Sequence, residues 1–143
     1  MRTGQPIISR PAWYDRNPVQ KVGNYIGTHG PHSTVERLSY TVPAGKKAMV
    51  EILLVMVRRQ TAAATPGIAQ CICQLTPSGG SITSILYALL RAEFNAAKDV
   101  MLLSIGTSMT LLPGDKLSFS TSDGSTNGAC DYEMMYKATE FDA

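Results

Sequence analysis

Two histidines, the only ones in the chain, are the first residues whose type and spacing could do chemistry. His29 and His32 lie in the segment GTHGPHSTVE, and Glu36 would add a third ligand of a kind that zinc accepts. A helix would align such an H-x-x-H pair on one ion, but Gly30 and Pro31 interrupt a helix here. We therefore expect no metal site, and we interpret this segment as the hinge where an N-terminal arm enters the folded domain.

The three cysteines offer a second chemistry, a disulfide or half of a zinc site. Cys71 and Cys73 are two residues apart, and on a strand such side chains stand about 6.5–7 Å from each other. That separation exceeds what a disulfide permits, and the sequence lacks a matching second pair of zinc ligands. We predict that these two residues and Cys130 are reduced thiols. The cysteine count is odd, and synthesis in a reducing cytosol is the simplest interpretation.

Two acidic residues near the C-terminus could form the carboxylate pair of a glycoside hydrolase. Asp131 and Glu133 alternate with the apolar Tyr132 and Met134, however, so they are expected on the solvated face of a strand. The sequence contains no nucleophile elbow, P-loop or dinucleotide fingerprint. It therefore predicts a protein that is not an enzyme and uses no cofactor.

Basic and aromatic side chains are interleaved in the N-terminal segment. This pattern could suit single-stranded nucleic acid, but residues 1–34 hold only four basic side chains against one acidic one. Tyrosine, tryptophan and arginine also anchor protein interfaces, so we expect a protein partner and no direct nucleic-acid binding. The candidate partner-binding residues are Arg10, Trp13, Tyr14, Arg16, Lys21 and Tyr25.

The same segment differs from the rest of the chain in its composition. Residues 1–34 hold four of the eight prolines and show no helix or strand period, so they cannot build a core of their own. Large side chains such as Ile7 and Trp13 nevertheless indicate that the segment orders against a partner. We predict an extended N-terminal arm over residues 1–34 and a β-sandwich domain over residues 35–143.

The strands that would position these residues are organised around residues 38–59. The sequence LSYTVPAGKKAMVEILLVMVRR reads as two strands joined by a Pro-Ala-Gly turn. The run 52–57 is apolar on both faces, so one face would pack on the opposite sheet, and a loop, the arm or a partner subunit would cover the other. We expect Leu54 to lie in the sandwich interior, and we expect the chain to form a multimer.

Shorter strands follow in the remaining sequence. Residues 91–99 break the strand pattern as either a loop or one helical turn, and residues 123–128 form a polar loop. About eight strands without a strong amphipathic helix predict an all-β fold, an antiparallel β-sandwich of the jelly-roll type. The sequence predicts neither a membrane span nor a secretory signal peptide. The expected further strands are 68–76, 82–90, 100–105, 109–112, 117–121 and 130–137.

Four segments resemble small virion proteins of tailed bacteriophages: YTVPAGKKAMVE, TPSGGS, TLLPGDKLSFSTSDGSTNGACDY and ATEFDA. The proteins in question are single β-sandwiches that decorate or cement the capsid, often as trimers, and the resemblance covers about residues 34–143. It implies a mechanical role in which the chain clamps neighbouring coat subunits. It also implies the major capsid protein and further copies of the chain, as a homotrimer, as partners. The protein would be made in the host cytoplasm and would reside on the capsid surface of the virion.

A second hypothesis remains open, because similar sandwiches occur in tail and receptor-binding proteins. The chain would then be a receptor- or glycan-binding module of a phage tail or fibre. Trp13 and the polar loop 123–128 would be its candidate contacts.

Overall fold

The computed structural model describes residues 17–59, 69–81, 84–91, 100–103, 108–124 and 129–143. Every regular element within these ranges is a β-strand, which confirms the all-β prediction. No helix in these ranges is long and apolar enough to cross a membrane. The strands are β1 (Val19–His29), β2 (His32–Thr41), β3 (Lys46–Arg59), β4 (Ala69–Thr76), β5 (Ser84–Arg91), β6 (Val100–Leu103), β7 (Ser108–Leu111), β8 (Lys116–Asp123) and β9 (Cys130–Asp142).

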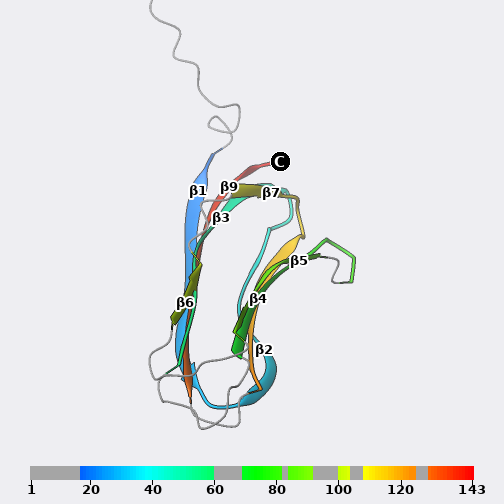
Figure 1. Ribbon diagram of the computed structural model, residues 1–143. Coiled ribbons are helices and arrows are strands. Elements are labelled where there is room, and N and C mark those ends of the chain that lie inside the picture. The colour runs from blue at the N-terminus through cyan, green and yellow to red at the C-terminus, as the bar shows by residue number, and fades with distance from the viewer. Residues whose placement is uncertain (1–16, 60–68, 82–83, 92–99, 104–107, 125–128) are drawn as a thin grey trace, which may run out of the picture.

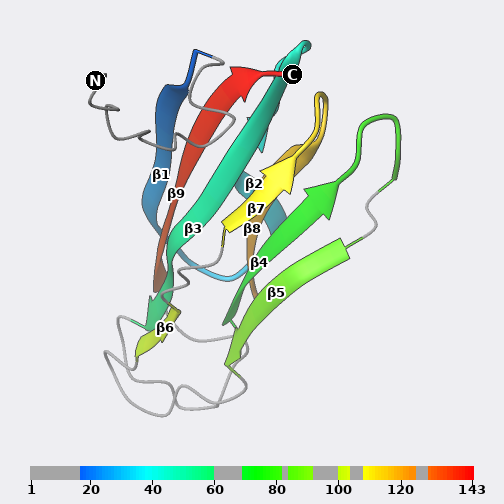
Figure 2. The ribbon, with the colours of Figure 1, turned by 90° about the horizontal axis from the view of Figure 1, so that it is seen from above.

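The strands form two antiparallel sheets that pack face to face (Figure 1), and Figure 2 shows the same two sheets from above. One sheet has the order β1-β9-β3-β6, with β7 also paired to β3, and the other has the order β2-β8-β4-β5. The pairs β1·β9, β2·β8, β3·β6 and β4·β5 make one long double-stranded ribbon, and rolling that ribbon places β9 beside β3 and β8 beside β4. This is the jelly-roll topology, as predicted. β7 and β6 occupy successive parts of the same edge of β3, so they act as two pieces of one strand.

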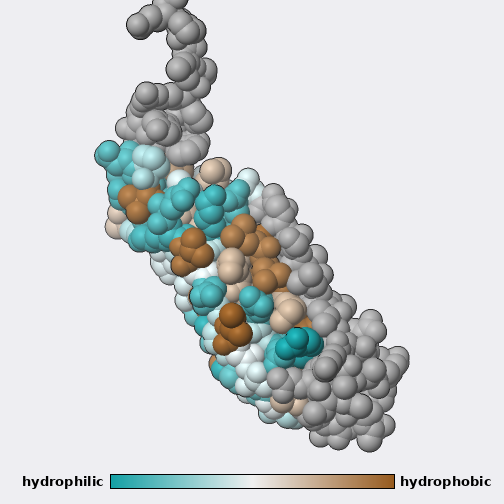
Figure 3. All heavy atoms as spheres, turned by 90° about the vertical axis from the view of Figure 1, so that its left-hand side faces the viewer, coloured by the Kyte–Doolittle hydropathy of each residue, from teal (hydrophilic) through white to brown (hydrophobic). Residues whose placement is uncertain are grey.

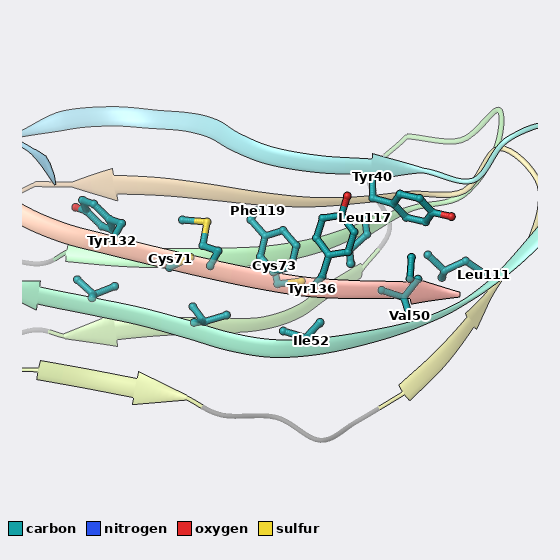
Figure 4. Close-up of a cluster of buried hydrophobic side chains, with 14 of the residues drawn as sticks. Tyr40, Val50, Ile52, Cys71, Cys73, Leu111, Leu117, Phe119, Tyr132 and Tyr136 are labelled. Atoms are coloured by element: carbon teal, nitrogen blue, oxygen red, sulfur yellow. The ribbon is translucent and has the colours of Figure 1, made fainter. Parts of the chain in front are cut away.

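The core lies between the two sheets, where alternate side chains of facing strands meet (Figure 4). The alternation predicted for β9 is confirmed, because Tyr132, Met134 and Tyr136 are buried. Across the sandwich, the ring of Phe119 on β8 stacks on Tyr136 with the ring centroids 6.2 Å apart. The three cysteines are buried reduced thiols within this core, as predicted.

A β-bulge at Leu53 changes which residues of β3 face the core. The register with β9 shifts between Ile52 and Leu54, so one extra residue enters β3 at this point. Ile52 and Val55 are therefore both buried although they are three residues apart. Leu54 lies opposite Met135 on the outer side of the sheet. The prediction that Leu54 lies in the interior is wrong, because an apolar run cannot reveal where a bulge shifts its phase.

The predicted boundary of the arm at residue 34 is also contradicted for residues 19–34, which belong to the sandwich. β1 pairs with β9 without interruption, from Val19 opposite Glu140 to His29 opposite Cys130. β2 then begins at His32 in the other sheet, so the hinge expected around the two histidines is the corner between the sheets. Residues 1–16, the remainder of the predicted arm, lie outside the described residues.

Glycines at inward positions of β1 remove the alternation of apolar and polar residues by which a strand is predicted from sequence. Gly23 occupies an inward position, where a Cβ atom would overlap the ring of Tyr136. Gly27 lies four residues further along the same inward side, where a Cβ atom would overlap the hydroxyl end of Tyr25. Neighbouring rings thus supply the apolar cover that side chains at positions 23 and 27 would otherwise provide, and no alternation is visible in the sequence.

Candidate partner-binding surface

Lys21, one of the predicted partner contacts, is engaged within the sandwich. Its ammonium group lies 3.0 Å from Oε1 of Glu140 on β9. The Tyr40 hydroxyl donates a hydrogen bond of 2.9 Å to the same oxygen. Glu140 is only 4% exposed, so Lys21 compensates a buried carboxylate.

Tyr25, a second predicted contact, belongs to a cluster of rings at the corner between β1 and β2. Its hydroxyl is hydrogen-bonded to Nε2 of His29, and the Arg37 guanidinium lies 6.0 Å from the centre of its ring. The rings of His29 and His32 have centroids 5.6 Å apart. Burial, the Arg37 charge and the neighbouring His32 lower the pKa of His29. Within the described residues, no group of three or more histidine, cysteine or acidic side chains could hold a metal ion.

The remaining predicted contacts cannot be placed in the structure. Four of the six candidates lie outside the described residues, namely Arg10, Trp13, Tyr14 and Arg16. The chain enters the described sandwich at Asn17, whose amide Nδ2 donates a 3.0 Å hydrogen bond to Asp142. Asn17 therefore lies at the end of the sandwich that also holds Asp142 and Ala143.

A surface that the sequence did not single out carries the exposed apolar side chains. It is the outer side of β1, β9 and β3, and we call it the outer face (Figure 3). Val22 and Ile26 on β1 are 66% and 68% exposed. Cross-strand pairing aligns Asn24, Met135 and Leu54 in one row across β1, β9 and β3, and it aligns Ile26, Glu133 and Met56 in the next row. The outer face is thus built from Val22, Asn24, Ile26, Leu54, Met56, Glu133 and Met135.

Two ion pairs flank the outer face along the strand direction. Lys137 on β9 lies 3.2 Å from Glu51 on β3 at one end. At the other end, Arg58 binds Asp131 through two nitrogens, and the Thr28 hydroxyl donates to the same carboxylate at 2.7 Å. Asp131 is therefore held in a structural ion pair. Apolar side chains bordered by paired charges resemble the core and rim of a protein interface.

A shallow groove crosses the outer face beside this second ion pair. It has a volume of about 410 Å³ and is lined by Ile26, Met56 and Glu133 together with the Arg58–Asp131 pair. The groove is lined by both apolar and charged side chains, and a concave surface with convergent polar groups is a candidate ligand site.

The signal for this surface was present in the sequence but incomplete. Val22, Asn24 and Ile26 are spaced by two, as on one strand face. Their partners from β9 and β3 are more than 25 residues away in the chain and could be identified only from the pairing.

No protein-family model matches the chain, and no curated protein matches it. The chain is similar to structures of the infectious bursal disease virus. The Gx strain has a TM-score of 0.48 at 13% identity, and the Gt strain has a TM-score of 0.46 at 12% identity. Each match covers 88% of this chain, which spans about a third of the virus chain (33%). A pilus of Bacillus endospore appendages has a TM-score of 0.39 at 12% identity, covering 94% of this chain and 96% of that chain.

Proposed function

We propose that the chain is a structural virion protein that decorates or cements the capsid of a tailed bacteriophage by binding neighbouring coat subunits. The observation that carries this proposal is the outer face, where Val22 and Ile26 are two-thirds exposed and no described element covers them. Exposed apolar patches of this kind mark interaction sites. The sequence resemblance to phage virion proteins gives the class of partner, and jelly rolls occur in viral capsid domains.

The fold suits a mechanical role because the outer face is built on long strands. β9 has 13 residues and β3 has 14, and both run along the whole sandwich. Their inward side chains are locked in the core, which makes the sheet a rigid platform for a partner. In this proposal the apolar residues bind a coat subunit, and the flanking ion pairs form a polar rim.

Residues 1–16 would be the docking element that remains from the predicted arm. Sixteen extended residues reach at most about 58 Å, enough to cross a neighbouring subunit. The proposed contacts in this segment are Arg10, Trp13, Tyr14 and Arg16. Lys21 and Tyr25 leave the set of proposed contacts, since Glu140 and His29 already engage them.

The test is attachment to purified phage heads that lack the protein. The full chain should co-sediment with heads and not with tails. Deletion of residues 1–16 should weaken attachment at least about tenfold while circular dichroism still reports a β protein. A deletion that binds heads normally would remove these residues from the proposal, and co-sedimentation with tails alone would overturn the head location.

The second candidate function is glycan or receptor binding in a tail or fibre, and the groove beside Arg58 and Asp131 favours it. Arg58→Ala should then abolish binding to a host glycan in calorimetry. In the capsid proposal, the wild-type chain shows no heat of glycan binding, so this measurement separates the two functions.

A further inference from the structure

β1 is an edge strand that lacks the usual protection against pairing. Within the described residues it pairs only with β9, and that register is unbroken over eleven residues. The other edges differ. β2 contains two register shifts, the pairing of the edge strand β5 with β4 shifts register once, and β6 and β7 have four residues each. Bulges and short strands are devices that keep edges from pairing, and a long regular edge is a template for another strand.

The side chains of β1 also leave this edge open. Lys21 is its only acidic or permanently basic residue, and its ammonium group is directed to Glu140 within the same chain. Val22 and Ile26 are the most exposed large apolar residues described. Charged side chains, which would repel an added strand, are thus absent from the outward side of β1.

We propose that β1 pairs antiparallel with β1 of a second copy of this chain, about a two-fold axis at Asn24. Asn24 is the middle residue of Val19–His29, so this register uses the whole strand and leaves no overhang. It places Val22 of each copy opposite Ile26 of the other, on the same side of the sheet. The two most exposed apolar residues of each copy then lie side by side in two symmetric pairs, and their outward ends remain on the outer face.

Other two-fold registers leave an exposed apolar residue of β1 without an apolar partner on the second copy. An axis at Val22 would pair the two Val22 side chains but place Ile26 opposite Pro18, beyond the end of the strand. An axis at Ile26 would place Val22 opposite Gly30. The register centred on Asn24 is therefore the one that pairs both residues and keeps every backbone group of β1 within reach of the second copy.

This contact goes beyond the proposed function and does not rest on it. It joins the two β1-β9-β3 sheets into one continuous sheet, so the outer faces of both copies lie on the same side. It also predicts an even number of copies in solution, in place of the trimer that the resemblance implied.

Disulfide trapping in the full chain tests the register. Asn24→Cys places two cysteines opposite each other across the axis, where Cα atoms of antiparallel partners lie about 4.5–5.5 Å apart, within disulfide range. Gln20→Cys is the matched control on the same strand face, because its two copies would stand about 27 Å apart. Mild oxidation should convert Asn24→Cys, and not Gln20→Cys, into a disulfide-linked dimer, since the native cysteines are buried.

The proposal is overturned if light scattering shows a monomer and Asn24→Cys stays reduced under mild oxidation. That result is expected if residues 1–16 cover the edge of β1. Crosslinking of Gln20→Cys in place of Asn24→Cys would overturn the register.

Charge exchange gives an independent measurement. Val22→Asp and Ile26→Lys should each weaken dimerisation at least about tenfold, because each places a charge opposite an apolar side chain. The double variant places aspartate opposite lysine in both symmetric pairs and should restore most of the lost affinity. A double variant that is as weak as the two single variants combined would contradict the pairing of Val22 with Ile26.

Discussion

At the scale of single residues, the buried carboxylate of Glu140 shows how a residue chosen as a partner contact can instead hold the fold together. Glu140 accepts a hydrogen bond from Tyr40 and forms an ion pair with Lys21 of the edge strand β1. The sequence shows a lysine in a cationic segment. It does not show that a carboxylate more than a hundred residues away needs that lysine.

Lys21→Met should therefore destabilise the fold by about 1–2 kcal/mol at pH 7, because it leaves a buried carboxylate without its counter-charge. Lys116→Met is the matched control, since Lys116 pairs with Glu36 and both side chains are well exposed. It should cost about 0.5 kcal/mol or less. Urea denaturation measures both, and equal losses would contradict the structural role of Lys21.

Buried phenols and a thiol make stability fall at alkaline pH. Burial, more than any other cause, raises the pKa of Tyr40, Tyr132 and Tyr136, and it raises the pKa of Cys71 to about 12. The unfolded chain releases these protons near pH 9–10, whereas the folded chain keeps them. The stability is fully present below about pH 9 and is lost as the pH rises, by about 1.4 kcal/mol per pH unit for each group.

Phenolate absorbance of the buried tyrosines should therefore appear together with unfolding in an alkaline titration followed by circular dichroism. Tyr132→Phe removes one of these titrating groups, so the free energy of unfolding should fall with pH less steeply, by about 1.4 kcal/mol per pH unit. Phenolate formation by all six tyrosines near pH 10 in a chain that remains folded would contradict the burial of these three rings.

At the scale of the strand, the sequence predicted the alternation of β9 but not the phase of β3. β9 alternates apolar and polar residues, so its inward face can be read directly. Residues 52–57 of β3 are all apolar, and the bulge at Leu53 leaves no mark in such a run.

The bulge predicts opposite outcomes for two adjacent substitutions. Val55→Asp should destabilise the fold by several kcal/mol, because it buries an unpaired carboxylate in the core. Leu54→Asp lies on the outer face and should cost about 1 kcal/mol or less in thermal or urea denaturation. A larger loss of stability for Leu54→Asp than for Val55→Asp would contradict the bulge and support a regular register.

β1 was missed as a strand because its inward positions are glycines covered by rings from elsewhere. Gly23→Ala should cost about 1–3 kcal/mol, since the added methyl group overlaps the ring of Tyr136. Gly30→Ala is the matched control, because a Cβ atom there meets no atom within 4 Å, and it should be close to neutral. Equal stability of the two variants would mean that Tyr136 does not pack over β1.

At the scale of the whole molecule, strand and turn patterns were sufficient to predict a jelly roll. The turn at Pro43–Gly45 and the turn at Pro113–Asp115 separate strands whose apolar faces must meet, and a two-layer sandwich is the compact solution. The partner surface could not be predicted in the same way. It combines residues of three strands that become neighbours only when the first and last strands pair.

We propose that the capsid binds the outer face, so one substitution on that face tests this proposal most directly. Ile26→Asp introduces a charge at a 68% exposed position, and Leu112→Asp introduces the same charge at a 54% exposed position in the turn before β8. Both should leave the melting temperature nearly unchanged. In a co-sedimentation titration with phage heads, Ile26→Asp should weaken binding at least about tenfold while Leu112→Asp binds like wild type. Binding of Ile26→Asp at wild-type strength would contradict attachment through the outer face.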